Sequence, residues 1–227
     1  MRIVNIRDAG RIFIRVVKKF SNQKNVVVGL CGGRSVVEFY KDIVRNKNKI
    51  SKKVWKKINF FFVDERVVNK NSKEGNYFVA KENLFLDLIK SKLISWKRVH
   101  RFGTYKNINL ELKNYTNLLS RFGGNFDIIV LSSGEDGHIA SLFPRHKLLK
   151  EKGKKYLYLW NSPKAPAKRV TVSPRFIEDA KSGLIFFVGE EKKEAFRMFK
   201  NNKVKIWDCP AKLARRIRGL YVVRELD

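Results

Sequence analysis

Apolar residues follow two alternating patterns along this chain. Between Phe13 and Phe20 they recur at intervals of three and four, which predicts an amphipathic helix. The run Val26–Leu30 that follows has no polar side chain, as is typical of a parallel strand that is buried on both faces. Because helical patterns and buried runs alternate to the C-terminus, we predict an α/β fold: a mostly parallel, Rossmann-like sheet flanked by helices on both faces.

The same two patterns predict the remaining elements. We expect further strands at residues 58–63, 126–131, 156–160, 169–173, 184–188 and 220–223. Further helices are expected over residues 36–44, 77–88, 112–122 and 190–201. Residues 64–76 have no periodicity and are predicted to form a long loop, and loops of this kind often carry function. No repeat or linker interrupts the pattern, so residues 1–227 are predicted to form a single domain.

Composition excludes several classes of protein. Of the 227 residues 44% are hydrophobic, and only 14 are Gly and 5 are Pro, which excludes disordered and fibrous chains. The two cysteines, Cys31 and Cys209, are too few for a disulfide framework and are typical of reduced thiols. No apolar stretch reaches the roughly 20 residues that a membrane span requires. We therefore expect a cytoplasmic protein that does not associate with membranes.

The net charge raises a second possibility for function. The chain has 50 Lys and Arg against 21 Asp and Glu, which is a formal net charge of +29. Such a charge favours polyanions, because covering phosphates releases counterions. The basic residues are scattered in short clusters, such as 47–57 and 147–155, without a basic tail or an RNA-binding aromatic signature. Specific nucleic-acid binding is therefore not expected, and a polyanion-binding protein is kept as an alternative.

Three polar loops directly follow predicted buried strands, at residues 31–35, 64–66 and 133–138. If the strands are parallel, these loops converge at the carboxyl edge of the sheet, where α/β proteins bind ligands. The first loop has the groups of a phosphate site. Its glycines let backbone N–H groups come close to an anion, and it also has a hydroxyl and a helix N-terminus. Its residues are Gly32, Gly33, Arg34 and Ser35. Their spacing matches neither a Walker loop nor a dinucleotide fingerprint, and a plain strand-to-helix turn is the alternative.

The other two loops contain groups suited to acid–base chemistry. His138 can transfer protons near neutral pH, and Asp136, two positions earlier, can orient or polarise it. In the second loop, the Asp64 carboxylate can hold a base or a water, and the Arg66 guanidinium can bind an oxyanion. A structural histidine and a solvated salt bridge are the alternative interpretations of these pairs.

Two later segments supply further cations. Residues 162–169 form a proline-stiffened basic loop, in which Lys164 and Arg169 could be held over an anionic ligand. Residues 189–192 have the pattern of a helix start, where Lys192 would be either a ligand-binding or a surface side chain. No group of residues has the spacing of a metal site, so we expect no metal and no other cofactor.

In their order along the chain, these motifs resemble the 6-phosphogluconolactonase family, within a larger group that includes glucosamine-6-phosphate deaminases and ribose-5-phosphate isomerases. Residues 127–144 are similar to the family's strand and its Asp-Gly-His-x-Ala-Ser-Leu-Phe-Pro signature. Residues 64–68, 162–172, 189–192 and 210–211 carry supporting matches. The deaminases have an Asn-Glu-Pro element after the histidine, where this chain has residues 141–144, Ser-Leu-Phe-Pro. The absence of that glutamate disfavours amino-sugar ring opening.

The resemblance implies a carboxylic ester hydrolase that converts 6-phospho-D-glucono-1,5-lactone to 6-phosphogluconate in the oxidative pentose phosphate pathway. His138 is then expected to be the general base on water, with Asp136 supporting it. Arg66 is expected to stabilise developing charge or hold a closed loop, and Asp64 to order that part of the site. A phosphosugar deaminase or isomerase of the same fold is the alternative, and the sequence is compatible with a monomer or a homodimer.

The resemblance also assigns the phosphate of the substrate to the loop at residues 32–35, aided by Arg169 and Lys192, with Lys164 near the lactone or the phosphate. The family usually has Ser-Gly-Gly-Ser-Thr-Pro in this loop, whereas this chain has Cys-Gly-Gly-Arg-Ser-Val at residues 31–36. Arg34 therefore either contributes a charge to phosphate binding or points into solvent.

Overall fold

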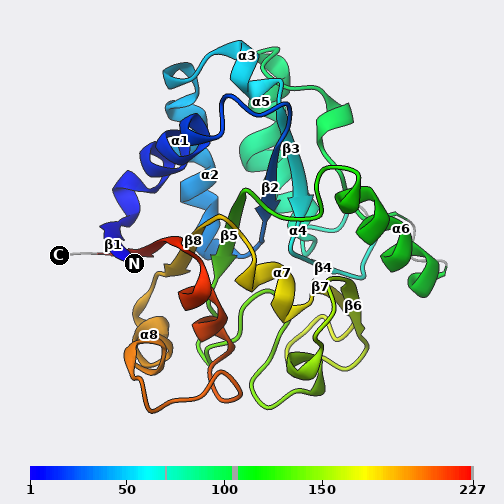
Figure 1. The fold of residues 1–227 in the computed structure, drawn as a ribbon, viewed down its shortest axis with the longest axis vertical. Coiled ribbons are helices and arrows are strands. Elements are labelled where there is room, and N and C mark those ends of the chain that lie inside the picture. The colour runs from blue at the N-terminus through cyan, green and yellow to red at the C-terminus, as the bar shows by residue number, and fades with distance from the viewer. Residues whose placement is uncertain (70, 104–106, 226–227) are drawn as a thin grey trace.

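A central parallel sheet organises the computed structural model, which describes residues 1–69, 71–103 and 107–225 (Figure 1). Within these residues the sheet has six strands in the order β1-β9-β8-β5-β2-β3, and each neighbouring pair is parallel. The strands are β1 (Arg2–Asn5), β2 (Val26–Leu30), β3 (Ile58–Phe62), β5 (Ile128–Ser132), β8 (Ser182–Phe187) and β9 (Gly219–Arg224). The predicted parallel α/β architecture is confirmed.

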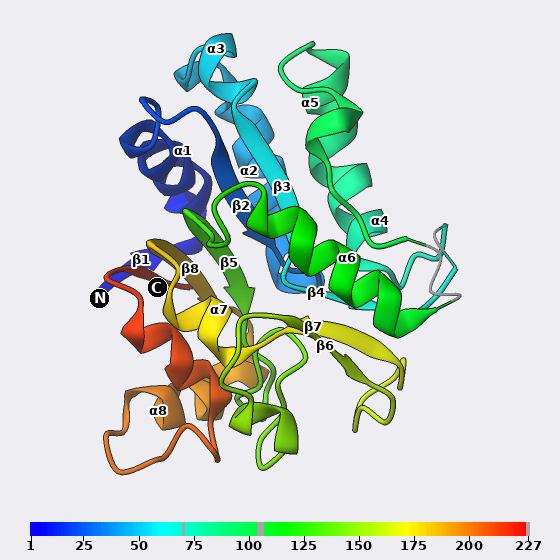
Figure 2. The ribbon, with the colours of Figure 1, turned by 45° about the vertical axis from the view of Figure 1, so that its right-hand side comes forward.

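Helices cover both faces of this sheet (Figure 2). They are α1 (Ala9–Lys19), α2 (Val37–Arg45), α3 (Lys52–Trp55), α4 (Asn76–Ala80), α5 (Leu86–Lys90), α6 (Ile108–Ser120), α7 (Pro174–Glu178) and α8 (Lys193–Lys200). Residues Lys81–Phe85 continue the chain helically between α4 and α5. None of the helices in the described residues is long and apolar enough to cross a bilayer.

The three phenylalanines of β3 are divided between the two faces of the sheet. Phe60 and Phe62 contact Phe85 of the α4–α5 segment, whereas Phe61 contacts Tyr115 of α6. Successive side chains of a strand point to opposite faces, so these two helical segments lie on opposite faces of the sheet. A continuous apolar run is therefore the sequence signature of a strand that is covered twice.

A second, smaller sheet stands beside the first. It is antiparallel, in the order β4-β7-β6, and consists of β4 (Asp64–Arg66), β7 (Arg169–Val172) and β6 (Tyr156–Leu159). The two sheets are joined by backbone and side-chain hydrogen bonds, because Val172 N donates to Val63 O (2.7 Å) and Tyr156 Oη donates to Phe62 O (2.9 Å).

The prediction that residues 64–76 form only a loop was wrong at its start, because β4 occupies the first three residues. A strand of three residues is too short to show alternation, and its partner β7 lies about a hundred residues away in the sequence. Strand β1 and helix α7 were also not predicted. The strands expected at 156–160 and 169–173 exist, but they belong to the small sheet.

The strand order places a crevice at the carboxyl ends of β2 and β5. From β2 the chain moves outward to its neighbour β3, and it later returns to β5 on the other side of β2. The connections from two such strands run in opposite directions, and the crevice between their loops is where open α/β sheets bind ligands. The loops predicted to converge, 31–35 and 133–138, leave these two strands.

Helices α1 and α2 pack closely because Gly10 has no side chain. Its backbone N–H donates to the buried carboxylate of Asp42 on α2, with an N···Oδ2 distance of 2.8 Å. A Cβ at position 10 would lie 2.7 Å from the backbone carbonyl carbon of Asp42, a distance that real Cβ atoms do not show.

We expect Gly10→Ala to lower the free energy of unfolding by about 1–3 kcal/mol, because the helices must separate to admit the methyl group. Urea unfolding followed by circular dichroism measures this change. Gly153→Ala, in an exposed loop, is the matched control and should have little effect. An unchanged midpoint for Gly10→Ala would contradict the close packing described here.

Candidate active site

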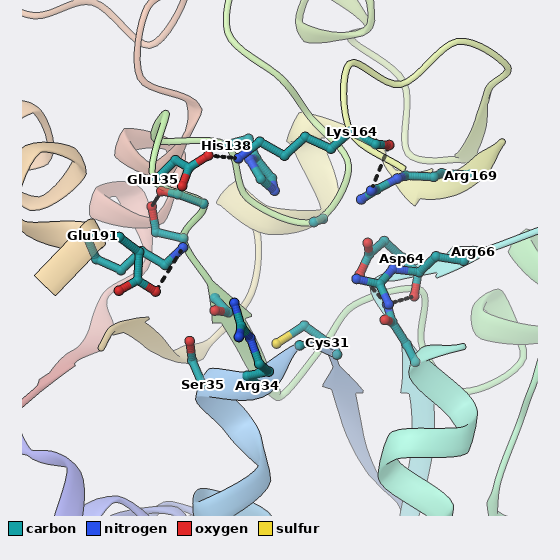
Figure 3. Close-up of a pocket in the computed structure, with 18 of the residues that line it drawn as sticks. Cys31, Arg34, Ser35, Asp64, Arg66, Glu135, His138, Lys164, Arg169 and Glu191 are labelled. Atoms are coloured by element: carbon teal, nitrogen blue, oxygen red, sulfur yellow. Dashed lines mark hydrogen bonds and ion pairs between the residues drawn. The ribbon is translucent and has the colours of Figure 1, made fainter. Parts of the chain in front are cut away.

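A cleft of about 650 Å³ opens at the carboxyl edge of the parallel sheet (Figure 3). Loops after β2 and β5, strand β4, the loop before β7 and the turn before α8 all contribute to its lining. All of the site residues predicted from the sequence except Asp136 line it: Gly32, Gly33, Arg34, Ser35, Asp64, Arg66, His138, Lys164, Arg169 and Lys192. Segments more than 150 residues apart in the sequence thus meet in one cavity.

His138 and Asp136 form a hydrogen-bonded pair in the loop after β5. The distance from His138 Nδ1 to Asp136 Oδ1 is 2.5 Å, and the His138 backbone N–H donates to the same oxygen (3.2 Å). A carboxylate only accepts hydrogen bonds, so Nδ1 is the donor of this bond and, in the neutral ring, Nε2 carries the lone pair. The ring rests on Phe143, with 4.4 Å between centroids. The loop therefore presents an oriented imidazole whose free nitrogen can accept a proton.

The pair affects the ionisation of Asp136. Burial by itself would raise the pKa of this carboxyl, but the hydrogen bond and the charge of His138 outweigh burial and hold that pKa at about 2. Asp136 is therefore anionic at every pH at which the protein is expected to work.

Gly134 makes room for the pair. A Cβ at this position would overlap the imidazole of His138 and lie 2.6 Å from Asp136 Oδ1. Gly137 adopts a φ of +80°, a conformation that side chains disfavour, and it packs against Cys209. The Gly-Glu-Asp-Gly-His segment is thus shaped by its glycines so that the acid and the imidazole face each other.

Asp64 is a buried carboxylate whose two oxygens are both occupied. Ser141 Oγ donates to Oδ2 (2.9 Å) and Asn76 Nδ2 donates to Oδ1 (2.9 Å). Arg66, two positions further on the same strand, donates from Nη1 to the carbonyl of Glu74 (2.5 Å). Asp64 on β4 therefore connects this strand by hydrogen bonds to the segment after His138 and to the start of α4.

Arg169 holds the proline-containing loop in shape. This side chain donates from Nε to the carbonyl of Pro166 (3.0 Å) and from Nη2 to the carbonyls of Lys164 (3.1 Å) and Ala165 (2.9 Å). Burial lowers the pKa of its guanidinium, although Asp64 partly opposes that effect. Lys164, at the tip of this loop, reaches Glu135 with an Nζ···Oε1 distance of 2.6 Å.

Two helix starts at the cleft share one backbone geometry. Gly33, with φ +99° and ψ 166°, precedes the turn Arg34–Val36 that leads into α2. Gly189, with φ +98° and ψ 149°, precedes the turn Glu190–Lys192 that leads into α8. A positive φ of this kind favours glycine. Both N-termini bring backbone N–H groups and the positive ends of helix dipoles to the cleft.

The charges of the cleft are predominantly positive. Five basic side chains line it, and the acidic residues among its lining are Asp64, Glu135 and Glu191. Glu135 pairs with Lys164, and Lys192 lies 3.8 Å from Glu191. Among the described residues no partner lies within hydrogen-bonding distance of the Arg34 guanidinium, which stands at the start of α2 (Figure 3).

The cleft is also lined by Asn76, Glu135 and Glu191, which were not predicted as site residues from the sequence. The two glutamates adjoin selected residues, and that adjacency was the available signal. Asn76 had none, because it ends an aperiodic segment and meets Asp64 only through folding. Within ranges 1–69, 71–103 and 107–225, no three His, Cys, Asp or Glu side chains come together as a metal site.

Comparison with solved structures identifies the fold. The chain superposes on a 6-phosphogluconolactonase from Trypanosoma brucei with a TM-score of 0.81 and 23% sequence identity, covering 98% of this chain and 95% of the other. It superposes equally well on a monomeric glucosamine-6-phosphate deaminase, with a TM-score of 0.82, 19% identity, and coverage of 99% and 97%. Two enzymes that differ in chemistry therefore share this fold, and the fold by itself does not distinguish them.

Sequence comparison is more specific. The 6-phosphogluconolactonase of Borreliella burgdorferi is 34% identical over 212 residues, which cover 89% of this chain and 85% of that protein. The 6-phosphogluconolactonase 4 of Saccharomyces cerevisiae is 30% identical over 212 residues, with coverage of 88% and 81%. The family model for glucosamine-6-phosphate isomerases/6-phosphogluconolactonase matches residues 5–222. The chain therefore belongs to the glucosamine-6-phosphate isomerase/6-phosphogluconolactonase family.

Proposed function

We propose that this chain hydrolyses 6-phospho-D-glucono-1,5-lactone to 6-phosphogluconate, as a step of the oxidative pentose phosphate pathway. The observation that carries the proposal is the His138–Asp136 pair, which faces a cleft rich in cations and helix N-termini. Such a cleft suits a substrate with a phosphate at one end and a hydrolysable carbonyl at the other. The names of the relatives at 34% and 30% identity support the same reaction.

His138 is proposed as the general base. Its free Nε2 accepts a proton from a water as the water oxygen attacks C1 of the lactone. The imidazolium that results is stabilised by the anionic Asp136 at Nδ1. Asp136 is therefore a positioning residue that acts through His138 and does not contact the substrate.

Attack on C1 produces a tetrahedral intermediate with a negative oxygen, and a cation near that oxygen lowers the barrier. We assign this role to Arg66, whose side chain lines the cleft beside Asp64. The bond between C1 and the ring oxygen then breaks, and the ring oxygen takes the proton from the His138 imidazolium. The products are the open-chain acid, which ionises to release one proton, and an unchanged His138.

The phosphate is proposed to bind at residues 32–35, where the backbone N–H groups precede α2. Arg34 and Lys192 are proposed to contact it directly, because both line the same cleft at helix starts. Lys164 reaches the ligand from the opposite loop, once it exchanges Glu135 for the anion. Arg169 acts through the carbonyls of that loop and so positions Lys164.

The deaminase and isomerase chemistry of the family is less well supported by these residues. In the segment after His138, Ser141 is bound to Asp64, and Leu142 and Phe143 are buried, so no carboxylate is present there. The two free, buried cysteines, Cys31 and Cys209, support the proposed cytoplasmic location.

We expect His138→Ala to reduce kcat/KM for the lactone by about 10²- to 10⁴-fold, the usual contribution of a general base. Proton release after addition of freshly prepared lactone, corrected for spontaneous hydrolysis, measures this change. His146→Ala, which alters a histidine outside the cleft, should retain wild-type kinetics. Full activity in a folded His138→Ala protein would overturn the assignment.

The His138→Ala variant should also raise the pKa of Asp136 from about 2 toward its ordinary 3.8. The side-chain hydrogen bond and the charge of His138 no longer oppose burial, whereas the backbone hydrogen bond from residue 138 and the charge of Lys164 remain. In the wild type, the depressed pKa contributes stability above about pH 4, and that contribution is lost as the pH falls through about 2. Carboxyl carbon NMR measures the titration, and a carboxyl that still titrates near 2 in the variant would contradict the pairing.

Arg34→Ala is expected to raise KM about 10-fold or more with little change in kcat, because a charged hydrogen bond to the phosphate is lost in ground and transition states alike. The effect should shrink as salt is added. Lys41→Ala is the matched control, since Lys41 is an exposed cation further along α2 and does not line the cleft. Equal KM values for Arg34→Ala and wild type would show that Arg34 points away from the ligand.

A further inference from the structure

Two buried side-chain atoms in the described part of the chain have no hydrogen-bond partner, and both belong to residues that line the active-site cleft. They are Oδ1 of Asn76, an acceptor, and Nε of Arg66, a donor. Folded proteins pair nearly all of their buried polar groups, because an unpaired one loses water without replacement. Two such atoms at the same cleft are therefore positions where a bound ligand can supply the partner.

The orientation of the Asn76 amide is determined by its neighbours. Its Nδ2 donates to the backbone carbonyl of Asp64 (2.8 Å) and to Asp64 Oδ1 (2.9 Å), so both amide hydrogens are used. Exchanging the amide oxygen and nitrogen would direct an oxygen at two oxygens. The side chain is 1% exposed, and its backbone N–H is held by Glu65 (2.6 Å). Oδ1 is thus a fixed acceptor that cannot turn to another partner.

The free acceptor lies between strand β4 and the loop at residues 32–35, where the phosphate is proposed to bind. A Cβ on Gly32 would overlap Asn76 Oδ1, so the amide oxygen occupies the space that a side chain at position 32 would fill. Arg66 follows Asp64 by two positions, and its side chain therefore points to the same face of β4. Arg66 Nη1 donates to the carbonyl of Glu74. The Nε–H group of the same side chain is buried and has no hydrogen-bond acceptor.

The chemistry of the two atoms selects the ligand group. A phosphate dianion and a lactone carbonyl only accept hydrogen bonds, so neither can pair with Asn76 Oδ1. A hydroxyl donates one hydrogen bond and accepts others, so it has the complementary group for each of the two atoms. On a phosphosugar lactone the ring hydroxyls are the groups with this property.

We propose that Asn76 and Arg66 form a subsite for one ring hydroxyl of the sugar, which makes Asn76 a specificity-determining residue. This inference rests on the proposed lactone hydrolysis. Oδ1 accepts the hydroxyl hydrogen, and Arg66 Nε–H donates to the hydroxyl oxygen. A site built to bind a hydroxyl discriminates strongly against an analogue that lacks it, because the buried groups of the site then stay unpaired.

A chemical double-mutant cycle tests the subsite. Wild type and Asn76→Ala are each assayed with 6-phosphogluconolactone and with its 2-deoxy, 3-deoxy and 4-deoxy analogues. For one analogue we expect wild type to lose about 10- to 100-fold in kcat/KM, and Asn76→Ala to lose as much on the parent lactone. The combination of that analogue with the variant should cost little more than either change alone, because the same hydrogen bond has been removed.

Asn83→Ala is the matched control. Asn83 follows Asn76 by seven residues in the same helical segment, donates to the carbonyl of Val79 and does not line the cleft. Its kinetics on all four lactones should equal those of wild type. If Asn76→Ala instead loses the same factor on every lactone, Asn76 has a structural role only and the subsite is overturned.

A second arm does not depend on turnover or on Asn76→Ala folding. Binding of 1,5-anhydroglucitol 6-phosphate, which keeps the ring hydroxyls and phosphate but has no carbonyl, is measured by calorimetry with wild type and Asn76→Leu. The leucine has a similar branched shape and no acceptor atom, so we expect weaker binding of this ligand and unchanged binding of inorganic phosphate. Weakening of both ligands equally would contradict the subsite.

The two arms separate the inference from the proposed function. If wild type hydrolyses the parent lactone but every deoxy cycle is additive, the subsite fails and the function stands. If wild type binds the anhydro compound through Asn76 but hydrolyses no lactone, the subsite stands and the proposed reaction fails. If it does neither, both are wrong.

Discussion

Parallel pairing of β2 with β3 and β5 is the constraint on which the site depends. Parallel strands need crossover connections, and the helices in those connections cover both faces of the sheet. The strands of this sheet are then largely apolar, and polar site residues lie in the loops after β2 and β5. Because parallel strands end at a common edge, the loops after β2 and β5 open into one crevice. The loops at residues 31–35 and 133–138 are neighbours for this reason.

The buried carboxylate of Asp64 connects the small sheet to the site. Its backbone pairs with Thr171 on β7, and its side chain binds Ser141 and Asn76. One residue thereby fixes the position of β4, of the segment after His138 and of the first turn of α4. A network of this kind is rigid when all of its members are paired. Asn76 Oδ1 and Arg66 Nε, which have no hydrogen-bond partner, lie at the border of this network. In the proposed subsite, a sugar hydroxyl supplies both partners.

The large net charge of the chain and the charge of the cleft have separate consequences. The +29 charge is spread over the whole chain, and salt screens distant charges over about 10 Å at 0.1 M. Within the cleft, acidic residues pair with some of the cations, and the folded loops decide which cations are available to a ligand. Binding of an anionic ligand in the cleft therefore depends on local geometry, whereas the overall charge only raises the local concentration of anions.

Much of the fold and part of the site were determined by local sequence. Predominantly apolar runs predicted β2, β3, β5 and β8, because a strand that is covered on both faces buries nearly all of its side chains. Asp136 and His138 could be paired from the sequence, since two residues in one glycine-flanked loop cannot lie far apart. Only the tertiary structure decided that β4 joins a separate sheet, that Arg169 binds the carbonyls of its own loop, and that Asn76 turns its amide onto Asp64. These contacts depend on the path of the chain between distant or aperiodic segments, and no local pattern of residue types records that path.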